Sequence, residues 1–278
     1  SMQSKEETKA TDRGPRVVID GVVVKGEKKA PQAGKEHRNA LALFFFALIF
    51  AGVLILASGF FASCASSAAI KSDGGLRVDL KAEIPSLLGA KLRSLSGKDP
   101  GERLFDEASL RHSIEARSDF KILALAAPTS DSFSASLSVP SVESALAGSE
   151  LSRKGIVRLN KGSGWTELSV RLARGQGRTA LDLFPGVDEE LIDALSPPAL
   201  DEEPVSKAEY RTMLSSLIGS KAMKALDGAE LSLDLCAPET IIESEGGQAS
   251  GKVLRVRIPI LDLLCLEKPV LIRLRFKS

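Results

Sequence analysis

The feature that most constrains this chain is a long gap in its charge, because no Asp, Glu, Lys or Arg occurs between Arg38 and Lys71. Most of the gap is an apolar run from Ala40 to Ser63, which is 24 residues long and rich in Leu, Phe, Ala and Ile. As a helix this run would be roughly 36 Å long, enough to cross the hydrocarbon core of a bilayer. A helix of a soluble core would carry a polar stripe, and this run has none. We therefore expect a signal or transmembrane segment over residues 39–63.

Basic residues are concentrated before the apolar run. The 20 residues that follow Ser63 hold three basic residues beside three acidic ones. The 20 residues before Asn39 hold five, namely Lys25, Lys28, Lys29, Lys35 and Arg38. The basic flank of a membrane segment stays in the cytoplasm. Residues 1–38 are therefore predicted to be a charged cytoplasmic tail or a mis-assigned leader, with a transient hairpin over 17–24, and the C-terminal part is predicted to be exported.

The apolar run ends on the sequence Phe61-Ala62-Ser63-Cys64. A peptidase that cuts beside a cysteine needs small side chains at the two preceding positions, and a thiol is the nucleophile that can take a lipid. Here the chain resembles a bacterial lipoprotein signal, with Ala62, Ser63 and Cys64 matching the lipobox. Phe61 stands where Leu is usual, which is similar to the relaxed lipobox of spirochaetal lipoproteins. The resemblance implies that signal peptidase recognises Phe61, Ala62 and Ser63, and that Cys64 carries acyl chains such as palmitate.

Two features oppose cleavage. About 40 residues precede the apolar run, whereas a signal peptide begins with a short basic region. The run also exceeds the roughly 7–15 residues of an ordinary signal core. An uncleaved single-pass signal anchor with a cytoplasmic tail is therefore the alternative. Of the two, we favour the lipoprotein. In either case the exported domain is expected on the non-cytoplasmic side of a bacterial cell membrane or outer membrane.

Residues 64–70, which are small and polar at Ala65-Ser66-Ser67, are expected to form a lipid-attached tether. This part of the chain resembles the opening of LppM-type lipoprotein domains. The resemblance rests on Cys64, the tether and a glycine-containing strand pair over 70–84. That resemblance covers about 20 residues and implies no functional residues.

Residues 71–278 are expected to form an exported α+β domain. Apolar and polar residues alternate as in half-buried strands over 76–84, 133–139, 231–235, 254–258 and 272–277, and more weakly over 120–124, 156–159 and 165–172. Helical spacing occurs over 86–95, 104–116, 187–195 and 221–226. The clearest apolar stripe of a helix contains Tyr210, Met213, Leu214, Leu217 and Ile218. We predict a largely antiparallel sheet with helices packed on one face, preceded by one N-terminal hydrophobic helix.

Residues with catalytic or binding chemistry are few. The net charge of +1 and the 5% aromatic content argue against nucleic-acid binding. The sequence has no P-loop, no Gly-x-Ser-x-Gly and no His-Glu-x-x-His, and Gly175-Gln-Gly177 is expected to be a turn. His112 is the only histidine after the apolar run, and a local ion pair with Glu115 explains it more simply than catalysis. The acidic clusters at 188–190 and 201–203 lack the spacing of a calcium loop.

Two cysteines and one apolar segment leave alternatives open. Cys236 and Cys265 are expected to be buried free thiols, with a disulfide between them as the alternative. The segment from Ile258 to Pro269 is expected to pack in the core, with a lipid-sized groove as the alternative.

The sequence thus predicts a membrane-anchored envelope lipoprotein with a binding or scaffolding role. The expected partners are the lipid bilayer and, further, another envelope protein or a lipid, and no nucleic acid. No catalytic residue, metal or cofactor is expected. A lipid-binding envelope protein is a further alternative.

Overall fold

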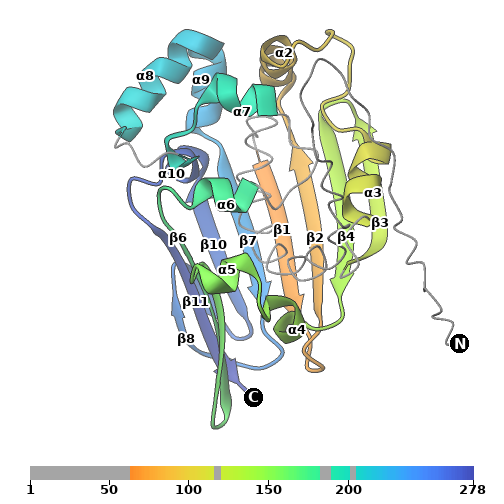
Figure 1. Ribbon diagram of the computed structural model, residues 1–278, viewed down its shortest axis with the longest axis vertical. Helices are drawn as coiled ribbons and strands as arrows, with labels where there is room; N and C mark the ends of the chain where they lie inside the picture. Colours follow the sequence, from red (N-terminus) through yellow and green to blue (C-terminus); the bar gives the residue numbers. More distant parts are fainter. Residues whose placement is uncertain (1–62, 116–119, 182–188, 201–204) are drawn as a thin grey trace, which may run out of the picture. The chain divides into compact units, whose positions relative to one another are not determined.

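The computed structural model describes residues 63–115, 120–181, 189–200 and 205–278, which form the two sheets and the helices of Figure 1. The predicted α+β class with mostly antiparallel strands is confirmed. The predicted N-terminal hydrophobic helix, the tail over 1–38 and its hairpin over 17–24 lie outside the described residues. Among the helices of the described ranges, none has the length and apolar content needed to cross a bilayer.

The larger sheet has seven strands, and the middle one is the first strand of the described chain. In spatial order they are β3 (Lys121–Thr129), β4 (Ser132–Val139), β2 (Leu76–Glu83), β1 (Ser63–Ile70), β7 (Glu230–Cys236), β10 (Val253–Pro259) and β9 (Gln248–Ser250). β1 pairs in parallel with β7, and the other pairings of the described strands are antiparallel. The alternation predicted for β2, β4, β7 and β10 is confirmed, with one face of each strand buried.

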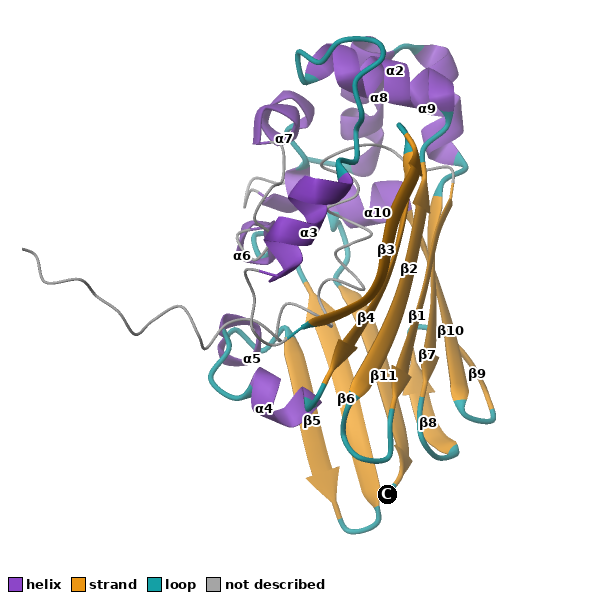
Figure 2. Cartoon of the chain, turned by 90° about the vertical axis from the view of Figure 1, so that its right-hand side faces the viewer, coloured by secondary structure: helices purple, strands orange, loops and turns teal. Residues whose placement is uncertain are grey.

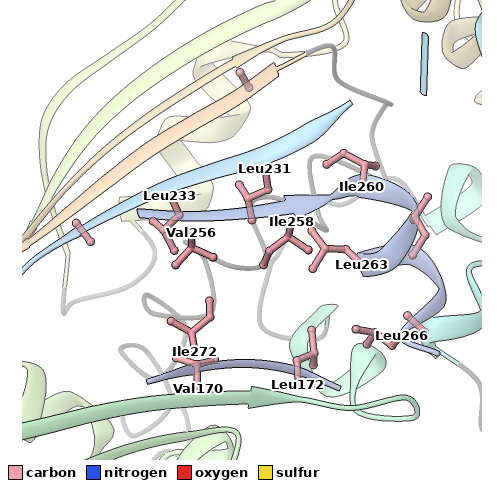
Figure 3. Packing of buried hydrophobic residues seen from close by; sticks show 14 of the residues in the cluster. Val170, Leu172, Leu231, Leu233, Val256, Ile258, Ile260, Leu263, Leu266 and Ile272 are labelled. Carbon is pink, nitrogen blue, oxygen red and sulfur yellow. The ribbon is translucent and has the colours of Figure 1, made fainter. Parts of the chain in front are cut away.

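A second sheet of four strands packs against the buried face of the first. Its spatial order is β5 (Val157–Gly162), β6 (Trp165–Leu172), β11 (Val270–Lys277) and β8 (Ile241–Glu245). Figure 3 shows Val256 and Ile258 of the larger sheet extending toward Ile272 and Leu172 of the smaller one. The sequence predicts one sheet, and the structure has two because alternation shows which face of a strand is buried but not which strands pair.

The chain crosses between the two sheets at Gly246 and Gly247, between β8 and β9. Gly246 has a φ of 80°, and a Cβ atom there would lie 1.9 Å from the carbonyl oxygen of Leu271. A Cβ atom on Gly247 would lie 2.5 Å from the carbonyl oxygen of Arg255. Both positions therefore require glycine, since the backbone of one strand passes directly against that of another.

The helices gather on one side of the larger sheet and beyond one of its ends (Figure 2). They are α2 (Ser86–Leu95), α3 (Glu107–Glu115), α4 (Val142–Leu146), α5 (Glu150–Arg153), α6 (Gly177–Leu181), α7 (Glu189–Leu195), the 3₁₀ turn η2 (Pro198–Leu200), α8 (Lys207–Ile218), α9 (Ser220–Asp227) and α10 (Ile260–Cys265). Helix α8 begins with a capping box between Ser206 and Glu209 and ends at Gly219, whose φ is 85°. Gly175-Gln-Gly177 is only partly the predicted turn, because Gly177 opens α6.

The apolar segment after β10 is buried, as predicted. Helix α10 contributes Ile260, Leu263 and Cys265 to the core, and Leu266 ends it in a left-handed conformation. The guanidinium of Arg174 donates to the carbonyl oxygen of Cys265 at 3.0 and 3.2 Å and to that of Val205 at 2.9 Å. The positive charge of Arg174 at the C-terminal end of α10 also interacts favourably with the helix dipole.

Candidate functional site

Cys64 is the second residue of β1, in register with Ala82 of β2 and with Leu231 of β7. Ser63 pairs with Glu83, and Phe61 and Ala62 lie outside the described residues. The segment over 64–70 that the sequence assigns to a tether is therefore a strand at the centre of the larger sheet. Its sequence, SCASSAAI, does not predict a strand, because small Ser and Ala residues occupy both faces and apolar and polar residues do not alternate.

Cleavage before Cys64 would remove Ser63 and its pair with Glu83. It would keep the pairs that β1 makes with β2 and β7 from Cys64 onward.

The end of the sheet at which β1 begins is covered by helices. Helix α2 follows β2 just after Glu83, and α9 precedes β7 just before Glu230, so both lie beside the start of β1. Helix α8 packs against α9 at the same end (Figures 1 and 2).

A buried ion pair fixes α2 to the sheet. The Arg93 guanidinium donates to both carboxylate oxygens of Asp131, in the turn between β3 and β4, with 3.2 Å between Nη2 and Oδ2. The hydrogen bond to Asp131 raises the pKa of Arg93, whose charge is thus stabilised. Gly89 lies against the same carboxylate, and a Cβ atom there would be 3.0 Å from Asp131.

An open hollow of about 460 Å³ lies between α8, α9 and the end of β10. It is lined by Lys207, Ala208, Arg211, Asp227, Ala229, Pro259 and Leu261. Lys207 Nζ lies 2.6 Å from Asp262 Oδ1, and this hydrogen bond raises the pKa of Lys207. Arg211 Nη2 lies 2.5 Å from Asp227 Oδ2, and it lowers the pKa of Asp227. These pairs hold both cations of the lining in their charged forms, an arrangement unsuited to proton transfer near neutral pH.

The other residues considered in the sequence lie on several elements, with His112 on α3, Cys236 on β7 and Cys265 on α10. His112 is exposed on α3. The sequence predicts an ion pair between His112 and Glu115, but Glu115 pairs with Arg111. Among the described residues, no group of three His, Cys, Asp or Glu residues is placed to hold a metal ion. Residues 188 and 201–203 of the acidic clusters lie outside the described ranges.

Cys236 and Cys265 are free, so the prediction of free thiols is confirmed, although Cys236 is only half-buried. Burial raises the pKa of the Cys265 thiol to about 12, and burial also raises that of Cys236. Both thiols are therefore protonated and weakly nucleophilic at neutral pH.

The outer face of the smaller sheet carries an ion-pair network that sequence reasoning missed. Arg275 donates to Glu167 at 2.7 and 3.0 Å and also contacts Glu243 at 2.7 Å. Its guanidinium lies 4.5 Å from the centre of the Trp165 ring, which in turn covers Gly162. The alternation of Arg273 and Arg275 along β11 could have predicted this network, since both arginines lie on one face of the strand and need polar partners on neighbouring strands. Arg273 joins the same network through Glu243 and Glu245, so each arginine has carboxylate partners on neighbouring strands, which suits stabilisation of the sheet.

The chain was compared with known families, curated proteins and solved structures. No family model and no curated protein matches the chain. The fold is similar to the NMR structure of the folded domain of LppM from Mycobacterium tuberculosis, with 12% identity and a TM-score of 0.35, over 79% of this chain and 91% of that one. This is the type of domain that the opening of the exported part resembles.

Proposed function

We propose that this chain is an envelope lipoprotein, held in the membrane by acyl chains on Cys64, whose exported domain binds or scaffolds another envelope component. One observation carries the proposal: the lipobox-like motif, of the relaxed spirochaetal kind, ends at Cys64, which is paired in β1 with Ala82 and Leu231. Cleavage before Cys64 would therefore keep every pair that β1 makes from Cys64 onward.

The position of β1 explains how such an anchor would act. Anchoring needs at least two acyl chains, because a single chain binds a bilayer only marginally. Since Cys64 already pairs with Ala82 and Leu231, the mature chain would have no linker between its lipid and its sheet. The exported domain would sit directly on the bilayer.

The chemistry of the described surface favours binding over catalysis. The cations that line the hollow beside α8 are paired with Asp262 and Asp227, and both free thiols have raised pKa values. The burial of α10 leaves its apolar residues in the core, which favours a partner at the surface over a lipid held beneath this segment. The bilayer is the first partner, another envelope protein or a lipid is the second, and nucleic acid is not expected.

Metabolic labelling tests the anchor. Cells expressing the native chain are grown with an alkyne fatty acid, and the purified protein is examined for the label. Wild type and Cys236→Ala are expected to be labelled, and Cys64→Ala is expected to be unlabelled. Cys236 is the matched control because its thiol is half-buried in β7 and lies outside the motif. Unlabelled wild type that retains residues 1–38 would replace the lipoprotein with the uncleaved single-pass anchor.

A further inference from the structure

Large apolar side chains are exposed at the end of the larger sheet where β1 begins. The described residues include five large hydrophobic side chains that are exposed, and three of them lie on α2 and α8. They are Leu87, which is 48% exposed, Met213, which is 42% exposed, and Leu217, which is 39% exposed. The helices that carry them cover the sheet end at which the predicted membrane segment joins the fold.

Helix α8 is more apolar than its packing requires. Of the apolar stripe found in the sequence, Tyr210, Leu214 and Ile218 are buried, whereas Met213 and Leu217 are exposed. Met213 and Leu217 are four residues apart and therefore neighbours on the surface of the helix. Together they form a small exposed apolar patch on α8.

The same helices carry an excess of positive charge. Exposed lysines lie on α2 at Lys91 and on α9 at Lys221 and Lys224, and no described residue forms an ion pair with any of them. The acidic residues of these helices have other partners, since Glu209 closes the capping box with Ser206 and Asp227 pairs with Arg211. Helices α2, α8 and α9 are therefore both apolar and cationic on their exposed surface, which complements a surface of anionic lipid headgroups.

We propose that the end formed by α2, α8 and α9 is a membrane-contact surface. Leu87, Met213 and Leu217 enter the headgroup region of the bilayer, and the three lysines contact anionic headgroups. The inference rests on the proposed function, because the apolar run ends at Ser63, beside these helices, and β1 leaves no linker that would let the domain move away. Anchor and surface together fix the orientation of the exported domain on the membrane.

The single tryptophan of the chain makes the orientation measurable. Trp165 pairs with Gly162 across the β5–β6 turn, which lies at the opposite end of the described fold from α8 and α9 (Figure 1). The membrane-extracted wild-type protein therefore reports on the far end. The double variant Trp165→Phe with Leu217→Trp, called the α8 reporter below, places its only indole on α8, and the exposed position leaves the core unchanged.

Both proteins are reconstituted into phosphatidylcholine and phosphatidylglycerol vesicles whose acyl chains carry bromine near the headgroup. The apolar face of an interfacial helix lies about 5–10 Å into the headgroup and acyl boundary, so the fluorescence of the α8 reporter is expected to fall by about half relative to vesicles without bromine. Trp165 of the wild type is expected to keep its fluorescence. Adding Lys91→Glu, Lys221→Glu and Lys224→Glu to the α8 reporter is expected to restore much of the lost signal.

Flotation of the same vesicles separates the two proposals. Protein that floats with the vesicles while the α8 reporter is unquenched, or while Trp165 of the wild type is quenched equally, would overturn the contact surface and leave the anchor in place. Protein that fails to float would overturn the proposed function and with it this inference. Quenching that the triple lysine variant leaves unchanged would overturn the role of anionic headgroups.

Discussion

The Arg93 and Asp131 pair gives the sharpest stability prediction, because it holds α2 to the sheet. The two side chains are 7% and 15% exposed. Removing one partner of a buried ion pair leaves the other charge buried and unpaired, which costs about 3–5 kcal/mol. Since Asp131 keeps some contact with water, we expect Arg93→Met to lower the free energy of unfolding by about 3 kcal/mol, the lower end of that range. This is a large share of the roughly 5–15 kcal/mol that stabilises a typical domain.

Urea unfolding of the full chain in detergent, followed by Trp165 fluorescence, measures this loss. The matched control is Arg77→Met, which breaks the exposed pair with Asp79, whose two side chains are 52% and 47% exposed. An exposed pair contributes about 0–1 kcal/mol, so the control should change little. The double variant Arg93→Met with Asp131→Asn should lose less stability than Arg93→Met alone, because no buried charge remains unpaired. Equal losses for Arg93→Met and Arg77→Met would refute the reasoning.

Four further predictions concern Tyr210, the two free thiols and Gly246. Tyr210→Phe should cost about 1–2 kcal/mol in the same urea assay, because the buried hydroxyl donates to the last carbonyl of α7 at 3.0 Å; an unchanged midpoint would contradict this. With a thiol reagent at pH 8, Cys265 should react only after unfolding and Cys236 slowly in the native state, and rapid native labelling of Cys265 would be the contrary result. Because the folded pKa of Cys265 is raised from 9.0 to about 12, its contribution to stability is present below pH 9 and is lost as the pH rises toward 12, so wild type should lose more stability between pH 8 and about pH 10 than Cys265→Ala. Gly246→Ala should prevent native folding or cost several kcal/mol, since its Cβ atom would lie 1.9 Å from a carbonyl oxygen of β11; native circular dichroism and an unchanged urea midpoint would argue against this.

The strands that alternate strictly were predictable from the sequence. Strands β2, β4, β7, β10 and β11 each combine one buried face with polar residues on the other, and the sequence pattern shows both. Helix α2 was predicted with its observed bounds, and the apolar stripe predicted for a helix from Tyr210 to Ile218 lies on α8. In each case the signal is local, so no knowledge of the partner strand or helix was needed.

The features that depend on distant contacts were not predictable. Strand β1 consists largely of Ser and Ala, and it is a strand because β2 and β7 supply hydrogen-bonding edges on both sides. The pair between Arg93 and Asp131 joins residues of two elements whose packing the sequence does not show. The stripe of α8 was found, but its division into a buried part and the exposed Met213 and Leu217 depends on what the core leaves uncovered.

The candidate site was predicted in part. The position of Cys64 in the sequence indicated an anchor, and lipid attachment there stays a prediction. What the structure adds is the place of Cys64 at the start of a central strand, beside α2 and α9. This placement connects the proposed anchor to the exposed apolar residues and lysines of the helical end.

The intact mass of the protein extracted from membranes is the most direct test of the lipid anchor at Cys64, because it reports cleavage and acylation together. We predict a chain that begins at Cys64 and carries at least two acyl chains, with the ester-linked ones released by mild alkali. Cys64→Ala is expected to lack this modified species. A mass that includes the residues before Cys64, with an unmodified thiol at that position, would contradict the lipid anchor.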